Sequence, residues 1–354
     1  MSKSNDWTLG VGVGGGETGG AGGFKRGLSS GKLALGPLRL NTRVAALLAV
    51  MLVLALVILL LPGPKRAGAD YLSGGRPHMS YFSQRAPYNR TYPLSGAERT
   101  LDGQRYRIGL ITDLDTASKV DGEENTWRAF YLRGYLNINA NHDQVSVQLD
   151  KEPVVLRSQL ARGGRGMELS ELVTFDGRLL TVDDRTGVVY EVSKGAVIPW
   201  TILADGDGKN TKGFKAEWMA VRDQVLYVGG LGKEWTTTSG ELVNLNPQWV
   251  KAVDPQGGVQ HLKWVDFYNG MRKEAGFSYP GYMIHEAAVW SDVHQRWFFM
   301  PRRASAERYT EEDDEHRATN LLISCSADFA DVRVRQLGPL NRIRGFSSLK
   351  FVPG

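Results

Sequence analysis

Four segments of the sequence share one pattern, and this pattern limits the fold more than any other feature. Each begins with an oxygen-bearing side chain that is followed by the apolar residues of a predicted strand, and these side chains are Ser170, Glu217, Glu286 and Ser347. In the first three segments a turn containing Asp and a second apolar strand follow. Burying a carboxylate at the start of an apolar strand is costly unless another group pairs with it. The pattern therefore indicates a repeated β unit whose polar ends converge.

The spacing of the repeat is typical of the blades of a β-propeller. The four positions are 47, 69 and 61 residues apart, and propeller blades span about 40–50 residues, with insertions that lengthen their loops. If the first strand of each blade lines the central channel, the four oxygen side chains surround one axis. The alternative is that polar residues at strand ends fall into register by chance.

The remainder of the chain from residue 105 onward also predicts a mostly β domain. Short apolar runs alternate with turn residues, at 107–112, 179–182, 188–192, 225–228 and 297–300. Asp176-Gly177 lies between two such runs and is typical of a hairpin turn. A mixture of carboxylate and hydroxyl oxygens is the ligand set that a hard cation such as Ca²⁺ prefers. We therefore expect a calcium site where the four repeat positions meet.

An unbroken apolar run of 18 residues at 44–61 predicts a membrane segment. A helix of about 20 residues crosses the hydrocarbon core of a bilayer. The 43 preceding residues are longer than the usual amino-terminal part of a signal peptide, although Ala67-Gly68-Ala69 resembles a cleavage site. Basic residues before the run favour a cytosolic N-terminus. We expect an uncleaved signal anchor, and a cleavable signal peptide is the alternative.

The distribution of charge makes the basic overall pI weak evidence for binding nucleic acid. Of the net charge of +5, four units belong to residues 1–62, so the rest of the chain is close to neutral.

We expect a Gly-rich, disordered cytosolic tail at 1–43 and a lumenal stem at 62–104. The sequon Asn89-Arg90-Thr91 predicts N-glycosylation of Asn89 in the stem. The single cysteine, Cys325, excludes an intrachain disulfide.

Two Asp-x-Asp motifs leave a second class of enzyme open. They are Asp113-Leu114-Asp115 and Asp205-Gly206-Asp207, and in Golgi glycosyltransferases this motif holds a metal–nucleotide complex. Together with an anchor and a stem, it would fit a type II Golgi glycosyltransferase. That interpretation requires an α/β nucleotide-binding half, which the pattern after residue 105 does not predict. A non-catalytic propeller that binds partners is the third possibility.

Ten segments between residues 105 and 353 resemble, in order, the soluble calcium-activated nucleotidases of the apyrase family. They include RIGLITDLDT at 107–116, RGGRGMELSEL at 162–172, KGFKAEWMAV at 212–221, YVGGLGKEWTTT at 227–238, PGYMIHEAAVWSD at 280–292 and GFSSLKFVP at 345–353. The resemblance implies a five-bladed β-propeller with Ca²⁺ in its central tunnel. It also implies that residues 105–354 form a nucleotidase domain.

The resemblance assigns roles to residues and a place in the cell. The family's calcium ligands match Ser170, Glu217, Glu286 and Ser347, which are the four repeat positions. Its active-site positions match Asp113, Asp184, Arg302 and Trp235. It implies Ca²⁺-dependent hydrolysis of nucleoside diphosphates, with UDP and GDP preferred, and of some triphosphates. The membrane-anchored branch implies a single-pass type II protein of the Golgi or endoplasmic reticulum, either retained or secreted after cleavage, and a homodimer is compatible with it.

The resemblance also implies a departure at the C-terminal side. Family members continue past the position that matches Pro353, and their final strand brings a fifth calcium ligand, a Glu. We therefore expect the last blade to be incomplete in the 354-residue chain. An open propeller exposes unpaired strand edges, so we expect this chain to be unstable or poorly active.

Overall fold

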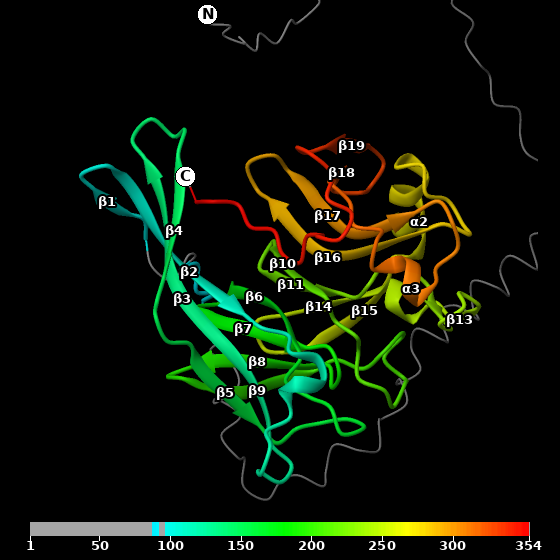
Figure 1. Ribbon diagram of the computed structural model, residues 1–354, viewed down its shortest axis with the longest axis horizontal. Coiled ribbons are helices and arrows are strands. Elements are labelled where there is room, and N and C mark those ends of the chain that lie inside the picture. The colour runs from blue at the N-terminus through cyan, green and yellow to red at the C-terminus, as the bar shows by residue number, and fades with distance from the viewer. Residues whose placement is uncertain (1–86, 92–95, 354) are drawn as a thin grey trace, which may run out of the picture. The chain divides into compact units, whose positions relative to one another are not determined.

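Antiparallel sheets make up most of the computed structural model, which describes residues 87–91 and 96–353 (Figure 1). Blade 1 has five strands and blades 2 to 4 have four each, and in every sheet neighbouring strands are antiparallel. Blade 1 comprises β1 (Glu98–Thr100), β2 (Gly103–Ile111), β3 (Trp127–Asn139), β4 (Val145–Leu149) and β5 (Val154–Ser158). Blade 2 comprises β6 (Leu169–Phe175), β7 (Arg178–Asp183), β8 (Val188–Ser193) and β9 (Ala196–Ile202).

Blades 3 and 4 carry the insertions. Blade 3 comprises β10 (Trp218–Arg222), β11 (Val225–Gly229), β14 (Trp249–Val253) and β15 (Val259–Lys263). Blade 4 comprises β16 (Tyr282–Ser291), β17 (Arg296–Ser305), β18 (Leu321–Ser326) and β19 (Val332–Gln336). A small hairpin, β12 (Trp235–Thr236) with β13 (Leu242–Asn244), lies between β11 and β14. Helix α2 (Val265–Glu274) connects blades 3 and 4, and α3 (Glu311–Asp314) lies between β17 and β18. Two 3₁₀ helices span Asp115–Ser118 and Asn246–Gln248.

The inner strands of successive blades, β2, β6, β10 and β16, contact one another. These contacts run from β2 to β6, from β6 to β10 and from β10 to β16, as expected for the channel-lining strands of a propeller. Strand β6 alternates buried and partly buried residues along its length, and Asp176 and Gly177, which follow it, have φ values of 48° and 73°. Such values form the tight hairpin turn that the sequence predicts. The propeller-like arrangement is thus confirmed for four blades.

Apolar side chains fill the spaces between successive blades. One cluster joins blades 1 and 2 around Leu156 and Tyr190, and a second joins blades 2 and 3 around Val182 and Met219. A third joins blades 3 and 4. No such cluster joins blade 4 to blade 1 within residues 96–353. Burial between the sheets therefore stabilises three of the blade contacts.

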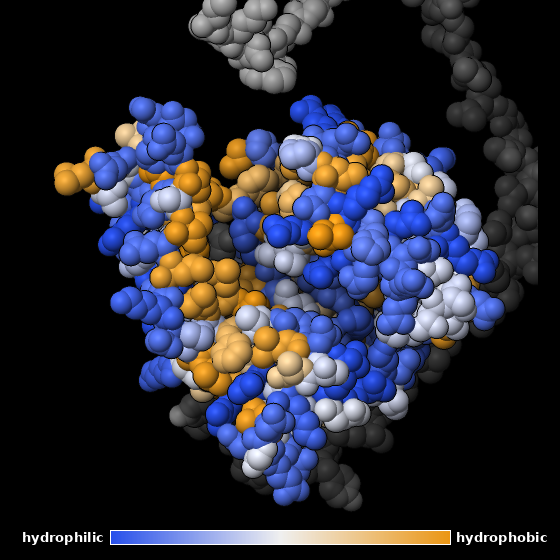
Figure 2. All heavy atoms as spheres, in the orientation of Figure 1, coloured by the Kyte–Doolittle hydropathy of each residue, from blue (hydrophilic) through white to orange (hydrophobic). Residues whose placement is uncertain are grey.

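The C-terminal segment lies in the opening between blades 4 and 1, where it is drawn in red (Figure 1). The strand predicted after Ser347 is wrong, because residues 345–353 contain no regular secondary structure. A strand requires a neighbouring strand that satisfies its backbone groups, and none pairs with this segment in the described part of the chain. A fifth blade is likewise not seen in that part. Hydrophobic side chains gather on the face of blade 1 beside the segment (Figure 2), and Leu110, Val147 and Leu149 are among the exposed ones.

The predicted anchor at 44–61, the tail at 1–43 and most of the stem lie outside the described residues. Within residues 87–91 and 96–353, no helix is long and apolar enough to cross a membrane. Part of the predicted stem lies against blade 2, where the Tyr88 ring packs on Phe175 and the Asn89 backbone N–H donates to Asp176 Oδ1 at 2.7 Å. Asn89 is exposed, and its glycosylation stays a prediction.

Candidate functional site

A polar cleft of about 760 Å³ opens at the end of the channel where β6, β10 and β16 begin. Every residue predicted to bind metal, to catalyse or to bind substrate contributes to its lining: Asp113, Ser170, Asp184, Glu217, Trp235, Glu286, Arg302 and Ser347. These residues come from all four blades and from the C-terminal segment. The structure therefore brings the sequence-predicted site together, with Asn89 outside it.

Two of the cleft residues, Ser170 and Glu286, lie where the pairing of an inner strand is irregular. The register of β6 against β7 shifts between Leu169 and Glu171, at Ser170. The register of β16 against β17 shifts between His285 and Ala288, around Glu286. A bulge re-aims a side chain relative to a regular strand. Both positions are therefore placed by deviations from the β pattern, whereas Glu217 directly precedes β10.

The two acidic repeat residues crowd one another in a buried setting. Glu217 is 7% exposed, and burial raises its pKa to about 8, with the nearby carboxylates of Glu286 and Asp184 acting in the same direction. Burial also raises the pKa of Glu286. A buried carboxyl beside other carboxylates is stabilised by a positive charge among them. The electrostatics of the cleft thus favour a bound cation.

Two basic side chains already contact these carboxylates. Lys215 Nζ lies 2.9 Å from Glu217 Oε1 and also contacts Asp184. Burial alone lowers the pKa of Lys215, but the attraction of Glu217 and Asp184 outweighs it and the pKa is raised. Arg302 Nη1 lies 2.6 Å from Glu286 Oε2. A dication at this place would therefore share the carboxylates with Lys215 and Arg302.

The oxygen atoms of the cleft fit calcium. Ser170 Oγ and Asp184 Oδ1 are buried and have no hydrogen-bond partner within the described ranges. A buried polar atom without a partner in the protein is costly, and a bound cation would satisfy both of these atoms. With the carboxylates of Glu217 and Glu286, these atoms form an all-oxygen donor set, which suits Ca²⁺ and does not suit Zn²⁺. The oxygen donors present thus fit the cation that the sequence predicts.

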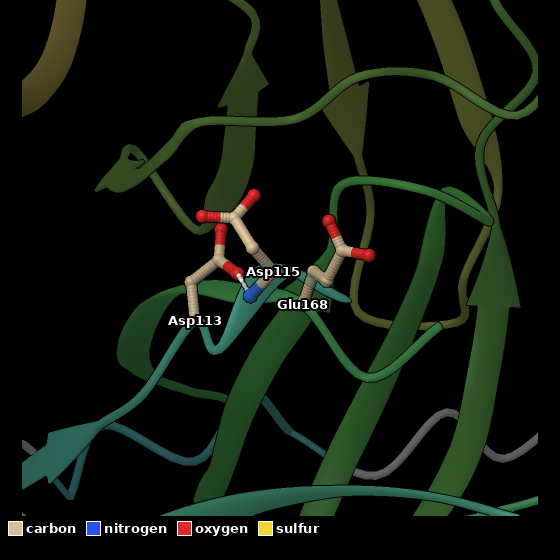
Figure 3. A group of neighbouring side chains, drawn as sticks. All are labelled: Asp113, Asp115 and Glu168. Carbon is tan, nitrogen blue, oxygen red and sulfur yellow. Dashed lines mark hydrogen bonds between the residues drawn. The ribbon is translucent and has the colours of Figure 1, made fainter. Parts of the chain in front are cut away.

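A second acidic group lies at the edge of the cleft (Figure 3). The carboxylates of Asp113 and Asp115, after β2, and of Glu168, before β6, have oxygen atoms within 4.8 Å of one another. Arg165 bridges two of them, because its Nη2 lies 3.0 Å from Asp115 Oδ1 and 2.5 Å from Glu168 Oε2. Arg165 thus supplies the positive charge that this group requires.

Sequence reasoning missed Glu168, Arg165 and Lys215. Glu168 is 1% exposed, and burial raises its pKa while Arg165 opposes the increase. Its signal in the sequence is an acid two residues before Ser170, at the start of an apolar strand. Arg165 pairs with the nearby Glu168 and Lys215 with the nearby Glu217, but the pairs of Arg165 with Asp115 and of Lys215 with Asp184 join residues distant in sequence, which no local pattern predicts.

The opposite wall of the cleft carries aromatic and basic groups. Trp235 is partly buried, and Lys212 Nζ lies 4.2 Å from the centroid of its ring. Lys233 Nζ lies 4.0 Å from the Tyr309 ring centroid and donates to Thr236 Oγ1 at 3.0 Å. Burial lowers the pKa of Lys233 to about 8. This wall offers a flat aromatic surface and positive charge to an anionic ligand.

The glycosyltransferase interpretation does not fit the fold. It requires an α/β nucleotide-binding half, whereas the described residues form antiparallel sheets with two α-helices. The Asp205-Gly206-Asp207 motif does not line the cleft. Asp205 Oδ2 instead accepts a hydrogen bond of 2.9 Å from Asn246 Nδ2, and Gly206 O accepts one from Lys251 Nζ. This motif is a structural loop.

Comparison with known proteins places the fold and the cleft in a family. Residues 114–354 match the family described as Apyrase. The chain is 58% identical over 266 residues to soluble calcium-activated nucleotidase 1 of Rattus norvegicus, which covers 75% of this chain and 66% of that protein. The protein of the same name from Mus musculus gives the same values.

A more distant relative is apyrase apy-1 of Caenorhabditis elegans. It is 48% identical over 255 residues, which cover 71% of each chain. The chain spans about two thirds of the length of the curated relatives that it matches. The match to the family includes the cleft-lining residues from Asp115 onward, and Asp113 lies one residue before it. On this evidence the chain belongs to the apyrase family.

Proposed function

We propose that this protein is a calcium-dependent nucleoside diphosphatase, which hydrolyses the terminal phosphoanhydride of UDP, of GDP and of some nucleoside triphosphates. The observation that carries the proposal is the convergence of Ser170, Glu217, Glu286 and Ser347 in one cleft with two unpartnered buried oxygen atoms. The names of the two rodent relatives include calcium activation and nucleotidase activity. Ca²⁺ would neutralise the charge on the phosphate oxygens.

The protein's own groups perform the rest of the reaction. Water attacks the terminal phosphorus, the anhydride P–O bond breaks, and a nucleoside monophosphate and inorganic phosphate leave. Asp113 or Asp184 is the carboxylate that would orient this water or accept its proton. The contact of Asp184 with Lys215 holds that carboxylate in place. Phosphoryl transfer depends mainly on such positioning and on charge neutralisation.

Substrate binding would use both walls of the cleft. Arg302 can donate two parallel hydrogen bonds to a phosphate, and its distance of 2.6 Å from Glu286 keeps it beside the calcium ligands. Trp235 would stack on the base with the ring face that Lys212 leaves free. Stacking tolerates different bases, which fits activity on both UDP and GDP.

One assay tests the proposal against its alternatives. Phosphate release is measured from UDP, GDP and a UDP-sugar in Ca²⁺, in Mn²⁺ and in chelator, with the parent chain and the Asp113→Asn and Asp184→Asn variants. We expect release from the diphosphates only with Ca²⁺, and loss of turnover in at least one of the two variants. Turnover of the UDP-sugar with Mn²⁺ would favour a glycosyltransferase, and no release under any condition would favour a non-catalytic propeller. Normal turnover in both variants would refute the role of the carboxylates.

The cellular setting is part of the same proposal. We propose that residues 44–61 anchor the protein in the membrane of the Golgi or endoplasmic reticulum, with residues 105–354 in the lumen. The exposure of Asn89 supports access by the glycosylation machinery. Endoglycosidase treatment of the protein from cells should shift its mass, and Asn89→Gln should remove the shift. Protection of the domain from protease in sealed microsomes completes the test.

A further inference from the structure

Glu171 on β6 is a buried carboxylate that faces away from the catalytic groups. Its side chain is 2% exposed, and it does not line the cleft, although the preceding residue, Ser170, does. Its partners come from the far end of the sequence. Ser348 Oγ donates to Glu171 Oε1 at 3.0 Å, and Lys350 Nζ lies 2.8 Å from Glu171 Oε2. One buried carboxylate thus binds two side chains of the C-terminal segment.

The C-terminal segment, residues 345–353, depends on side-chain contacts for its position. In the described part of the chain, its backbone groups make no hydrogen bond to the blades. Besides the contacts with Glu171, the ring of Phe351 packs on Phe298 with centroids 5.2 Å apart. A segment without backbone pairing is ordered only by such anchors, which must offset its loss of conformational entropy. The ion pair with Glu171 is the charged anchor among them.

In both β6 and the C-terminal segment, a residue that lines the cleft is followed by a residue that joins the two segments. Ser170 contributes to the cleft while Glu171 binds the C-terminal segment, and Ser347 contributes to the cleft while Ser348 binds Glu171. Anchoring at Ser348 and Lys350 therefore sets where Ser347 lies relative to Ser170.

We infer that Glu171 and Lys350 are positioning residues for the cation site, and that their ion pair holds Ser347 in the ligand set. The inference deepens the proposed function and rests on it for the identity of the cation. Neither residue touches the cation or the substrate. Groups that orient metal ligands commonly change metal affinity by about 10- to 100-fold when they are replaced.

The test measures calcium binding by titration calorimetry and chymotrypsin cleavage at Phe346 and Phe351 of the C-terminal segment, both without substrate. Lys350→Met should weaken calcium binding by about 10-fold or more and accelerate this cleavage. Lys350→Arg keeps the charge and should restore both. Lys263→Met, which removes an exposed lysine on β15, is the control and should change neither.

A milder variant covers the case in which Lys350→Met does not fold. Ser348→Ala removes one hydrogen bond and leaves the charge pair, so it should weaken calcium binding less, in the same direction. Calcium affinity equal to that of the parent in folded Lys350→Met, or in Ser348→Ala where the first variant does not fold, would overturn the inference and leave the proposed function standing. Absence of calcium binding by the parent chain would overturn both.

Discussion

The guanidinium of Arg302 donates a hydrogen bond of 2.6 Å to the carboxylate of Glu286. One residue of this pair is a predicted phosphate clamp and the other a predicted calcium ligand, so the pair connects the two functions of the cleft. The positive charge of Arg302 offsets the negative charge of Glu286, so it weakens the attraction of Glu286 for a cation. Substrate phosphate and Glu286 therefore compete for the same guanidinium.

Replacing Arg302 by Met should have opposite effects on the two ligands. Calcium affinity should increase, because a competing positive charge disappears. The KM for UDP should rise by about 10- to 100-fold, as expected for the loss of a hydrogen bond to a charged group. Calorimetry and steady-state kinetics measure the two effects, with Arg99→Met, an exposed position on β1, as the control. An unchanged KM would show that Arg302 serves only as the partner of Glu286.

Replacing Glu217 by Gln should abolish the stabilisation of the fold by calcium. A ligand that binds the native state stabilises it by about 2.7 kcal/mol at a concentration 100 times its Kd. We therefore expect calcium to raise the Tm of the parent and not that of Glu217→Gln. Glu241→Gln, at an exposed position outside the cleft, should behave as the parent. A normal calcium-induced rise in Glu217→Gln would remove Glu217 from the ligand set.

Replacing Trp235 by Ala should weaken nucleotide binding without changing the chemistry. Stacking of a base on an aromatic side chain contributes about 1–3 kcal/mol, so the KM for UDP and GDP should rise by about 5- to 150-fold while kcat stays close to that of the parent. Tyr279, which is 62% exposed, provides a control in Tyr279→Ala. A loss confined to kcat would place Trp235 in the reaction and not in base binding.

Lys251 should give the protein a stability that increases in alkaline solution. Lys251 is fully buried, its Nζ lies 3.0 Å from His261 Nδ1, and burial lowers its pKa to about 8 against the opposing effect of Asp205 and Asp207. In the unfolded chain a lysine keeps its proton up to about pH 10.4. Between these values the unfolded state binds more protons, so stability increases with pH.

Denaturant unfolding of the parent and of Lys251→Met measures this effect. The free energy of unfolding of the parent minus that of the variant should increase from pH 7 to pH 10. Lys263→Met should show no such trend, because Lys263 is exposed. A difference that stays constant or decreases would contradict the lowered pKa.

The repeat in the sequence predicted the fold because it records the pleat of the inner strands. Ser170 lies near the start of β6, Glu217 directly before β10 and Glu286 within β16, and the structure places all three in one cleft. That signal is local and recurs in blades 2, 3 and 4. The same pattern failed at Ser347, because a strand depends on a partner strand and not only on its own side chains.

The counter-charges of the cleft could not be predicted from the sequence. Lys215 meets Asp184, and Arg165 meets Asp115, only because adjacent blades bring distant loops together. The acidic residues Glu217 and Glu286 could be proposed as cation ligands from their positions in the repeat alone. The basic residues that share them follow from tertiary packing.

Replacing Gly229 by Ala should destabilise the interface between blades 3 and 4. A Cβ at Gly229 would lie 2.0 Å from the indole of Trp218, which is fully buried and packs against Trp264 and Trp297. A rigid ring held on several sides cannot move aside, so the cost should be about 1–3 kcal/mol or more, as for other overpacked cores.

Gly270 provides the matched control. It lies in α2, and a Cβ there would meet no atom within 4 Å. Gly270→Ala should therefore stabilise the protein by about 0.5–1 kcal/mol, because alanine loses less backbone entropy in a helix. Denaturant unfolding of both variants measures the contrast. Equal stability of Gly229→Ala and Gly270→Ala would show that the contact between Gly229 and Trp218 does not restrict the packing of the two blades.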